Sequence, residues 1–207
     1  MVDAMNEKTS RQAIMDCALE LLIRHGYRGA SFGDIATALG MTRANIHYHF
    51  GSKQALVEAV LADYVRATLA ALEGIWLASD LGFADRVEQM LTFSLERFHR
   101  YNKDGSPAGP WSLISRLRQD ADLLTPSGRK ALMEFSVALR VLLTKALERD
   151  VARGRFASEM PVAAVAAQLA LIADNASAVT LDAGGGVQLA ELYRGLVQIV
   201  GHGYGLR

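Results

Sequence analysis

Residues 31–53 read SFGDIATALGMTRANIHYHFGSK, and this stretch decides the fold of the first part of the chain. Ser31, followed three residues later by Asp34, has the spacing of a capping box, which satisfies free backbone N–H groups at the start of a helix. Gly40 follows the last apolar position and can take the left-handed conformation that closes a helix. Thr42 then offers a hydroxyl as the next N-cap. The stretch therefore predicts two short helices joined by a tight turn.

The second of these helices has two different faces. Ile46 and Phe50 are four residues apart, so both can pack on the core. Arg43, Ala44 and His47 fall on another face, which is free to contact a partner. Two short helices with this spacing are the sequence form of a helix-turn-helix, which places its second helix in the major groove of DNA.

The outward side chains of this helix suit DNA. Arg43 can donate two hydrogen bonds to guanine, Ala44 admits close approach, and Asn45 can bond to adenine or to a phosphate. His47 and Tyr48 carry donors suited to phosphate oxygens, which fix register without reading sequence. We therefore expect base contacts from the start of the helix and positioning contacts from its second half.

Lys53 adds a further indication of an anionic partner. Ser52 has the character of an N-cap for a third helix, so Lys53 lies in that helix's first turn. A cation there opposes the helix dipole, and a phosphate docked at the same place would remove the conflict.

The stretch from about Ser10 to Leu61, containing GASFGDIATALGMTRANIHYHFGSKQALVEAVL, resembles the DNA-binding domain of the TetR/AcrR family of bacterial repressors. The rest of the chain resembles that family only in length, helical character and order of elements. The sequence departs from the family's frequent Leu-Tyr-x-His-Phe pattern, because Ile46 and His47 stand before Tyr48. The resemblance implies that the DNA-contacting positions are Thr42, Arg43, Ala44, Asn45, His47, Tyr48 and Lys53.

Other interpretations of the same residues remain open at this stage. A capped helix pair with one Arg and one Lys occurs in many helical proteins. His47 and His49 are two residues apart and do not share a helix face, and no cysteine or carboxylate cluster joins them, so no metal site is expected. His49 can be a packed histidine beneath the surface, and Tyr48 can cover the seam to the next helix.

The composition is that of a soluble globular protein. The chain has 207 residues, of which 51% are hydrophobic and 21% charged, enough for a sizeable core in one or two domains. Four prolines and almost no alternating β-branched runs favour an all-α fold. We expect a three-helix helix-turn-helix domain over residues 1–54 and a helical-bundle domain for effector binding and dimerisation over residues 55–207.

Charge gives little support to DNA binding by itself. The formal net charge is zero, and residues 1–53 carry six Lys/Arg against five Asp/Glu. Arg43 and Lys53 nevertheless lie at the expected groove, with Lys8 and Arg11 near the start of the first helix. Binding should therefore weaken with salt along a shallow slope.

The location expected from the sequence is the cytoplasm. Cys17 is the single cysteine, which excludes an intrachain disulfide and fits a reducing compartment. The first residues are polar and lack an apolar signal core, so export is not expected. Residues 161–173 are apolar, but Gln168, Asp174 and Asn175 interrupt them, which favours a buried or interface helix over a membrane span.

Apolar periodicity predicts helices along the whole chain. The first, with its stripe at Ile14, Ala18, Leu21 and Leu22, should end at Gly26. The later helices are expected at 53–76, 83–98, 111–118, 126–154, 161–181 and 187–200. Two of them have long apolar stripes that should face the core. The stripe of the helix at 83–98 is Phe83, Val87, Met90, Leu91, Ser94 and Phe98, and that of the helix at 126–154 is Leu132, Phe135, Leu139, Leu142, Leu143 and Leu147.

The last two of these helices suit self-association. Small residues at Ala163, Ala166, Ala167 and Ala170 permit close helix approach. The resemblance implies that two such helices from each subunit form a four-helix dimer interface. The alternative is that they complete the core of a monomer. We favour the dimer, because two reading helices related by a twofold axis can recognise an inverted repeat.

An effector pocket is predicted with less support from the sequence. Aromatic surface mixed with a few polar anchors is typical of small-molecule sites. The candidate lining residues are Phe98, His99, Trp111, Arg116 and Asn175. Phe98 and Trp111 can equally be core residues, and Arg116 can lie on a solvated face.

The sequence therefore indicates a homodimeric, ligand-responsive transcriptional repressor that binds double-stranded operator DNA, with no cofactor. A transcriptional activator or a ligand-free DNA-binding regulator is the alternative within the same class. A helical-bundle enzyme is the rival from another class, and little favours it: the histidines are scattered, and the glycine run at 184–186 opens no phosphate-binding motif.

Overall fold

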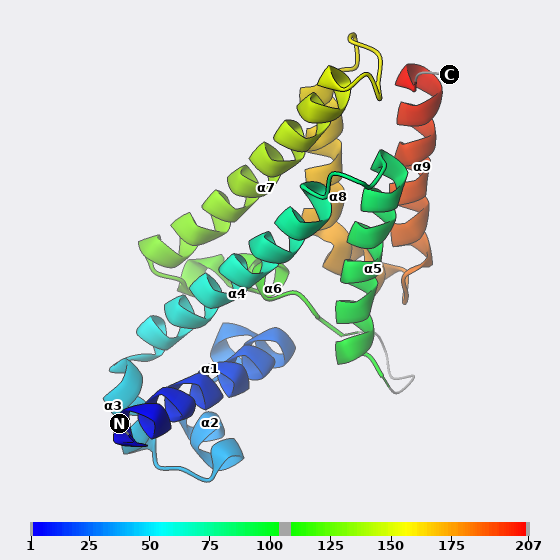
Figure 1. The fold of residues 1–207 in the computed structure, drawn as a ribbon. Helices are drawn as coiled ribbons and strands as arrows, with labels where there is room; N and C mark the ends of the chain where they lie inside the picture. The colour runs from blue at the N-terminus through cyan, green and yellow to red at the C-terminus, as the bar shows by residue number, and fades with distance from the viewer. Residues whose placement is uncertain (1, 104–108, 206–207) are drawn as a thin grey trace. The chain divides into compact units, whose positions relative to one another are not determined.

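The computed structural model describes residues 2–103 and 109–205 of the chain. Within these residues the regular structure is helical, with one isolated β-bridge between Phe156 and Gly205 (Figure 1). The all-α prediction is confirmed. The chain divides into two compact units. Unit 1 is Met1–Arg66 with Ser112–Leu132, and unit 2 is Ala67–Trp111 with Met133–Arg207.

The helices follow one another with short connections. Their bounds are α1 (Val2–Gly29), α2 (Phe32–Leu39), α3 (Arg43–Phe50), α4 (Lys53–Trp76), α5 (Phe83–Tyr101), α6 (Leu113–Gln119), the 3₁₀ turn η1 (Ala121–Leu123), α7 (Pro126–Ala152), α8 (Val162–Asp182) and α9 (Val187–Tyr204). Both α4 and α7 pass from one unit to the other. The predicted helices are all present, with ends that differ by a few residues.

Two of these ends have clear local causes. The helix α1 continues to Gly29, but its regular part breaks at Gly26, where φ is 70° and ψ is −174°, as the sequence predicted. The helix α6 begins at Leu113 rather than at Trp111, because the Ser112 hydroxyl accepts a hydrogen bond from the backbone N–H of Ser115 at 3.3 Å.

The break at Gly26 also gives α6 its place in unit 1. Side-chain atoms of Arg116 and Asp120 lie 2.6 Å from the position that a Cβ on Gly26 would occupy. The carboxylate of Asp120 accepts a hydrogen bond from the backbone N–H of Tyr27 at 2.8 Å. Only glycine therefore satisfies both the left-handed backbone and the close approach of α6 to α1.

In unit 2 the helix α9 packs against both α5 and α8 (Figure 1). The buried face of α5 is the predicted stripe of Phe83, Val87, Met90, Leu91, Ser94 and Phe98. The predicted stripe of α7 is buried as well, at Leu132, Phe135, Leu139, Leu142, Leu143 and Leu147. Periodicity thus identified the core-facing side of these long helices correctly.

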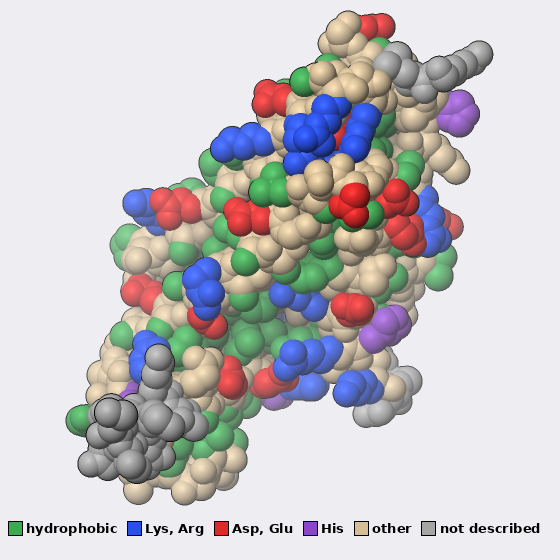
Figure 2. Space-filling view, in the orientation of Figure 1, with side chains coloured by type: hydrophobic (Ala, Val, Ile, Leu, Met, Phe, Trp, Pro, Cys, Tyr) green, Lys and Arg blue, Asp and Glu red, His purple; other side chains and the backbone are tan. Residues whose placement is uncertain are grey.

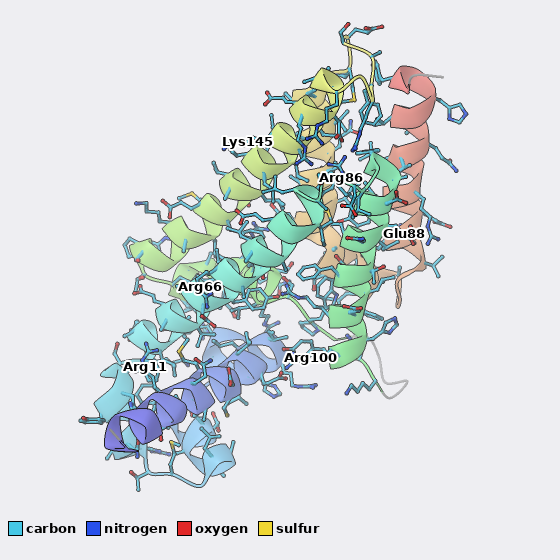
Figure 3. All side chains as sticks on the ribbon, viewed as in Figure 1. Arg11, Arg66, Arg86, Glu88, Arg100 and Lys145 are labelled. Carbon is cyan, nitrogen blue, oxygen red and sulfur yellow. The ribbon has the colours of Figure 1, made fainter. Side chains whose placement is uncertain are left out.

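One charged residue lies inside the α5 stripe. Arg86 is fully buried, and its guanidinium pairs with the equally buried carboxylate of Asp150 near the end of α7 (Figure 3). It also donates to the carbonyl oxygens of Trp76 at 3.2 Å and of Gly82 at 3.3 Å. The pair thereby ties the α4–α5 connection to α7.

Two further arginines hold the same connection. Arg155 donates to Asp150 at 3.3 Å, to the Leu81 carbonyl at 2.9 Å and to the Ser79 carbonyl at 3.0 Å. Arg149 donates to the carbonyl of Trp76 at 3.0 Å. Figure 2 shows Lys and Arg side chains gathered at this end of α7. Arg149 thus satisfies a carbonyl oxygen that the end of α4 leaves without a helical partner, and Arg155 satisfies two carbonyl oxygens of the connection to α5.

The burial of Tyr193 on α9 predicts that the folded protein loses stability at alkaline pH. It is fully buried, and burial raises the pKa of its hydroxyl, an effect that Ser94 partly offsets and Asp174 adds to. Tyrosines of the unfolded chain ionise near pH 10, so above about that pH the unfolded state loses a proton that the folded state keeps. The contribution of neutral Tyr193 to the free energy of unfolding is therefore complete below about pH 10 and is lost as the pH rises above that value.

We therefore expect Tyr193→Phe to flatten the fall of the free energy of unfolding above about pH 10, by up to roughly 1.4 kcal/mol per pH unit. Urea unfolding of both proteins at a series of alkaline pH values measures this slope. Tyr48→Phe is the control, because it removes an exposed tyrosine. Equal slopes for Tyr193→Phe and the unaltered protein would contradict the assignment.

Candidate DNA-binding surface

Local hydrogen bonds and a left-handed glycine cap α2 and α3 as the sequence predicted. The backbone N–H of Asp34 donates to the Ser31 hydroxyl at 3.2 Å, and the N–H of Ser31 donates to the Asp34 carboxylate at 3.1 Å. Gly40 closes α2 in the left-handed conformation, with φ of 62°. The Thr42 hydroxyl accepts from the N–H of Asn45 at 3.2 Å and begins α3. The helix-turn-helix therefore has caps on both sides of its turn.

The two faces of α3 are also as predicted. Ile46 is fully buried and Phe50 is 8% exposed, and together they fix α3 to the core of unit 1. Arg43, Ala44 and Asn45 at the start of the helix are exposed. The first turn of α3 therefore presents a cation, a small residue and an amide to an approaching partner, which is the chemistry of major-groove readout.

The exposed side chain of Arg43 lies against α2. Its guanidinium atoms Nη2, Cζ and Nε lie 2.7, 3.2 and 3.2 Å from the position that a Cβ on Gly33 would take. The carboxylate of Asp34 is close enough for the charges of Lys53 and Arg43 to lower its pKa, after the larger effect of its hydrogen bonds with Ser31. The start of α2 therefore has an acidic group near both candidate DNA-binding cations.

His47 is exposed, but its ring is held in place. Its Nδ1 lies 3.0 Å from the Gly51 carbonyl oxygen, and its ring meets the Phe32 ring edge to face, with centroids 4.7 Å apart. Because a carbonyl oxygen only accepts, Nδ1 carries the proton. Nε2 is then an acceptor in the neutral ring and a donor in the imidazolium, so the charged form suits a phosphate.

Tyr48 and Lys53 differ in exposure. Tyr48 is 75% exposed and packs edge to face on His49, with ring centroids 5.4 Å apart. Lys53 is half-buried, and its ammonium lies 4.6 Å from the centroid of the Tyr27 ring. Burial lowers the pKa of Lys53, against the opposing effects of Asp34 and Asp120. The Lys53 cation thus has the Tyr27 ring as a partner within unit 1.

Two contacts at this surface cannot be predicted from the sequence. The missing side chain of Gly33 makes room for Arg43. The Arg11 guanidinium lies 4.8 Å from the centroid of the Phe50 ring, joining α1 to α3 (Figure 3). Spacing within one helix carries no signal for such contacts, because each joins residues from two helices.

The five candidate effector residues lie in different surroundings. Phe98 and Trp111 are buried, and the Trp111 indole N–H donates to the Thr180 hydroxyl at 2.7 Å. His99 is exposed and lies on a surface hollow of about 650 Å³ between α5 and α9. The Asn175 amide donates to the carbonyl of Leu171 in its own helix at 2.8 Å.

The fifth candidate, Arg116, belongs to unit 1, whereas the other four belong to unit 2. It packs at Gly26 and lies 3.9 Å from the Asp120 carboxylate. An effector site built from this set stays a prediction. Metal binding is a separate question: within residues 2–103 and 109–205, no group of three or more His, Cys, Asp or Glu side chains could hold a metal ion.

A family model described as bacterial regulatory proteins of the TetR family matches residues 14–60, which contain the whole capped helix pair. Residues 14–60 therefore form a DNA-binding domain of the TetR type. The regulator TtgW of Pseudomonas putida, called uncharacterized, is 39% identical over 59 residues, which cover 28% of this chain and 44% of TtgW. The chain thus aligns with less than half of that relative's length.

The likeness to known transcriptional regulators extends beyond residues 14–60. The transcriptional repressor KstR2 of Rhodococcus jostii is 26% identical over 161 residues, which cover 77% of this chain and 74% of KstR2. A crystal structure of a TetR transcriptional regulator from Chloroflexus aurantiacus superposes with a TM-score of 0.81, covering 98% of this chain and 100% of that chain at 19% identity. That superposition shows a shared fold over nearly the whole chain.

Proposed function

We propose that the protein is a ligand-responsive transcriptional regulator, a repressor in its simplest form, which binds a palindromic operator as a homodimer in the cytoplasm. The observation that carries the proposal is the first turn of α3, where Arg43, Ala44 and Asn45 stand exposed on a helix capped at Thr42 and anchored by Ile46. The TetR-type domain and relatives named as transcriptional regulators support a regulator over an enzyme.

In this proposal the DNA-reading part is residues 1–54, and residues 55–207 bind the effector and dimerise. The compact units follow packing rather than function: unit 1 keeps the first turns of α4 and also takes in α6. The proposed functional boundary is at residue 54, because all the proposed DNA contacts lie on α3, on its N-cap Thr42 or at Lys53 in the first turn of α4.

The proposed dimer surface lies on α8 and α9. Leu171 on α8 is 65% exposed, and Leu192 and Ile199 on α9 are 42% and 69% exposed. In the described part of the chain, α8 alone is long and apolar enough to cross a membrane by length and composition, and 33% of its most apolar window is buried. A helix that packs on a second copy of the chain is also long, apolar and partly exposed in the single subunit. We propose that α8 packs on a second copy rather than in a membrane.

The proposed effector acts through a difference in affinity. A small molecule that prefers the form of the dimer unable to bind two half-sites would release the operator. A coupling free energy of about 1 to 3 kcal/mol, or roughly 5- to 150-fold in affinity, is typical of such regulation.

Selection of bound duplexes from a random DNA pool by the purified protein, followed by sequencing, tests the proposal directly. We expect enrichment of an inverted repeat, because a twofold dimer presents two copies of α3. Binding should weaken with added salt along a shallow slope, since few phosphate-binding cations are available. A folded protein that enriches no sequence would overturn the proposal.

Arg43→Ala is expected to lower discrimination at one base pair of each half-site by roughly 5- to 150-fold, the range of about 1 to 3 kcal/mol for a bidentate base contact. Arg43 is exposed, so the fold and the dimer should persist. Binding to the selected operator and to its single-base variants measures the effect. Unchanged preference at every base would show that Arg43 does not read a base, but it would not contradict DNA binding by the protein.

A further inference from the structure

Gly33, on the first turn of α2, lies outside the residues assigned to DNA contact. From its contact with Arg43 we infer that Gly33 is a specificity-determining position, which sets the orientation of the Arg43 guanidinium before DNA is bound. The inference rests on the proposed DNA-reading function and adds to it a residue that acts through Arg43.

The geometry is that of a flat side chain lying on bare backbone. Three atoms of the Arg43 guanidinium group, Nη2, Cζ and Nε, lie 2.7 to 3.2 Å from where a Cβ on Gly33 would be. A real Cβ does not tolerate neighbours at the shorter of these distances. Any residue other than glycine at position 33 would therefore displace the guanidinium from this place.

The backbone gives no separate reason for glycine at this position. Gly33 lies within the helix α2, and its φ is not positive, unlike those of Gly40 and Gly51. Glycine is a weaker helix former than alanine, so the helix itself does not favour glycine here. The space that Gly33 leaves is occupied by Arg43, so the contact is the feature that favours glycine.

Electrostatics assist the same orientation. A guanidinium at the start of α2 meets the positive end of the helix dipole, which is unfavourable alone. The Asp34 carboxylate offsets this, because it is near enough for Arg43 to help lower its pKa. Among the described residues, no hydrogen bond or ion pair holds the Arg43 guanidinium, so its N–H donors stay available for a base.

Pre-orientation matters because a long arginine side chain loses rotamer freedom when it docks. A guanidinium already confined on one side by α2 loses less of that freedom on binding and approaches the groove in one direction. Gly33→Ala would leave α2 helical but let Arg43 sample other rotamers, so it should weaken base reading without unfolding unit 1.

The test compares Gly33→Ala, Arg43→Ala and the double variant with the unaltered protein, using the operator recovered by selection and its single-base variants. We expect Gly33→Ala to lower discrimination about five- to tenfold, only at the base pair that Arg43→Ala also affects. In the Arg43→Ala background the same substitution should have no further effect. The thermal midpoint of the single variant Gly33→Ala should equal or exceed that of the unaltered protein, because alanine favours helix.

Gly74→Ala is the matched control, since it adds a methyl group at an exposed helical glycine on α4 with no atom nearby. Unchanged base preference in Gly33→Ala would overturn the inference. So would a Gly33→Ala effect that is as large in the Arg43→Ala background as in the unaltered protein. An Arg43→Ala protein with unaltered base preferences would overturn it as well. A wild-type protein that selects no operator would instead overturn the proposed function on which the inference rests.

Discussion

Asp150→Asn is expected to lower the free energy of unfolding by about 3 to 5 kcal/mol, the usual effect of removing one partner of a buried ion pair. Asp150 and Arg86 are both fully buried, so the substitution leaves the Arg86 guanidinium without a counter-charge in the protein interior. Arg155 would lose the same carboxylate. Urea unfolding at neutral pH, followed by circular dichroism, measures the change.

The matched control is Glu88→Gln, which removes the carboxylate of the exposed pair between Glu88 on α5 and Arg194 on α9 (Figure 3). Water solvates both groups of that pair, so its loss should change stability little. If Asp150→Asn unfolded at the same urea concentration and with the same slope as the unaltered protein, the pair would not have the stabilising role assigned to it.

Arg86 also illustrates what the sequence could have revealed. It lies three residues after Phe83 and four before Met90, on the same face as the apolar stripe of α5. A charged residue on that face indicates a buried partner, since unpaired charge inside a protein is costly. Nothing in the sequence identifies the partner, because Asp150 is 64 residues away.

The caps of α2 and α3 were predictable, because their hydrogen bonds are local in the sequence. The hydrogen bonds of Ser31, Asp34 and Thr42 join residues three apart, so spacing alone predicts them. The orientation of Arg43 was not predictable, because the space at Gly33 exists only after α2 and α3 have packed. Local capping is therefore encoded residue by residue, whereas the pose of the reading side chain depends on tertiary structure.

The effector residues show a second limit of periodicity. An aromatic residue on the buried face of a helix gives the same pattern whether it fills a core or lines a pocket. Phe98 and Trp111 lie in the core of unit 2, and the Trp111 indole is already bonded to Thr180. Arg116 instead joins α6 to α1 in unit 1. Composition cannot distinguish these roles, since they differ only in which helices meet.

Leu171→Arg is expected to convert the proposed dimer to a monomer and to weaken operator binding by at least about 100-fold. Leu171 lies on the apolar helix α8 and is 65% exposed in the single chain, so the substitution should leave the fold of the subunit intact. In a dimer joined through α8 and α9 it would bury two unpaired guanidinium groups, which is strongly unfavourable. A monomer reads one half-site and so loses much of the roughly 4 to 10 kcal/mol that separates specific from non-specific binding.

Val141→Arg on α7 is the control, because it also places a charge at an exposed apolar position, 45% exposed, but outside α8 and α9. Sedimentation velocity gives the oligomeric state of each variant, and titration of the selected operator gives its affinity. A Leu171→Arg protein that remains dimeric would exclude this surface from the interface. The gain in affinity from a second half-site depends on the two reading helices being joined in a dimer. A folded monomer that binds the full operator with unchanged affinity would therefore show that DNA reading does not depend on dimerisation.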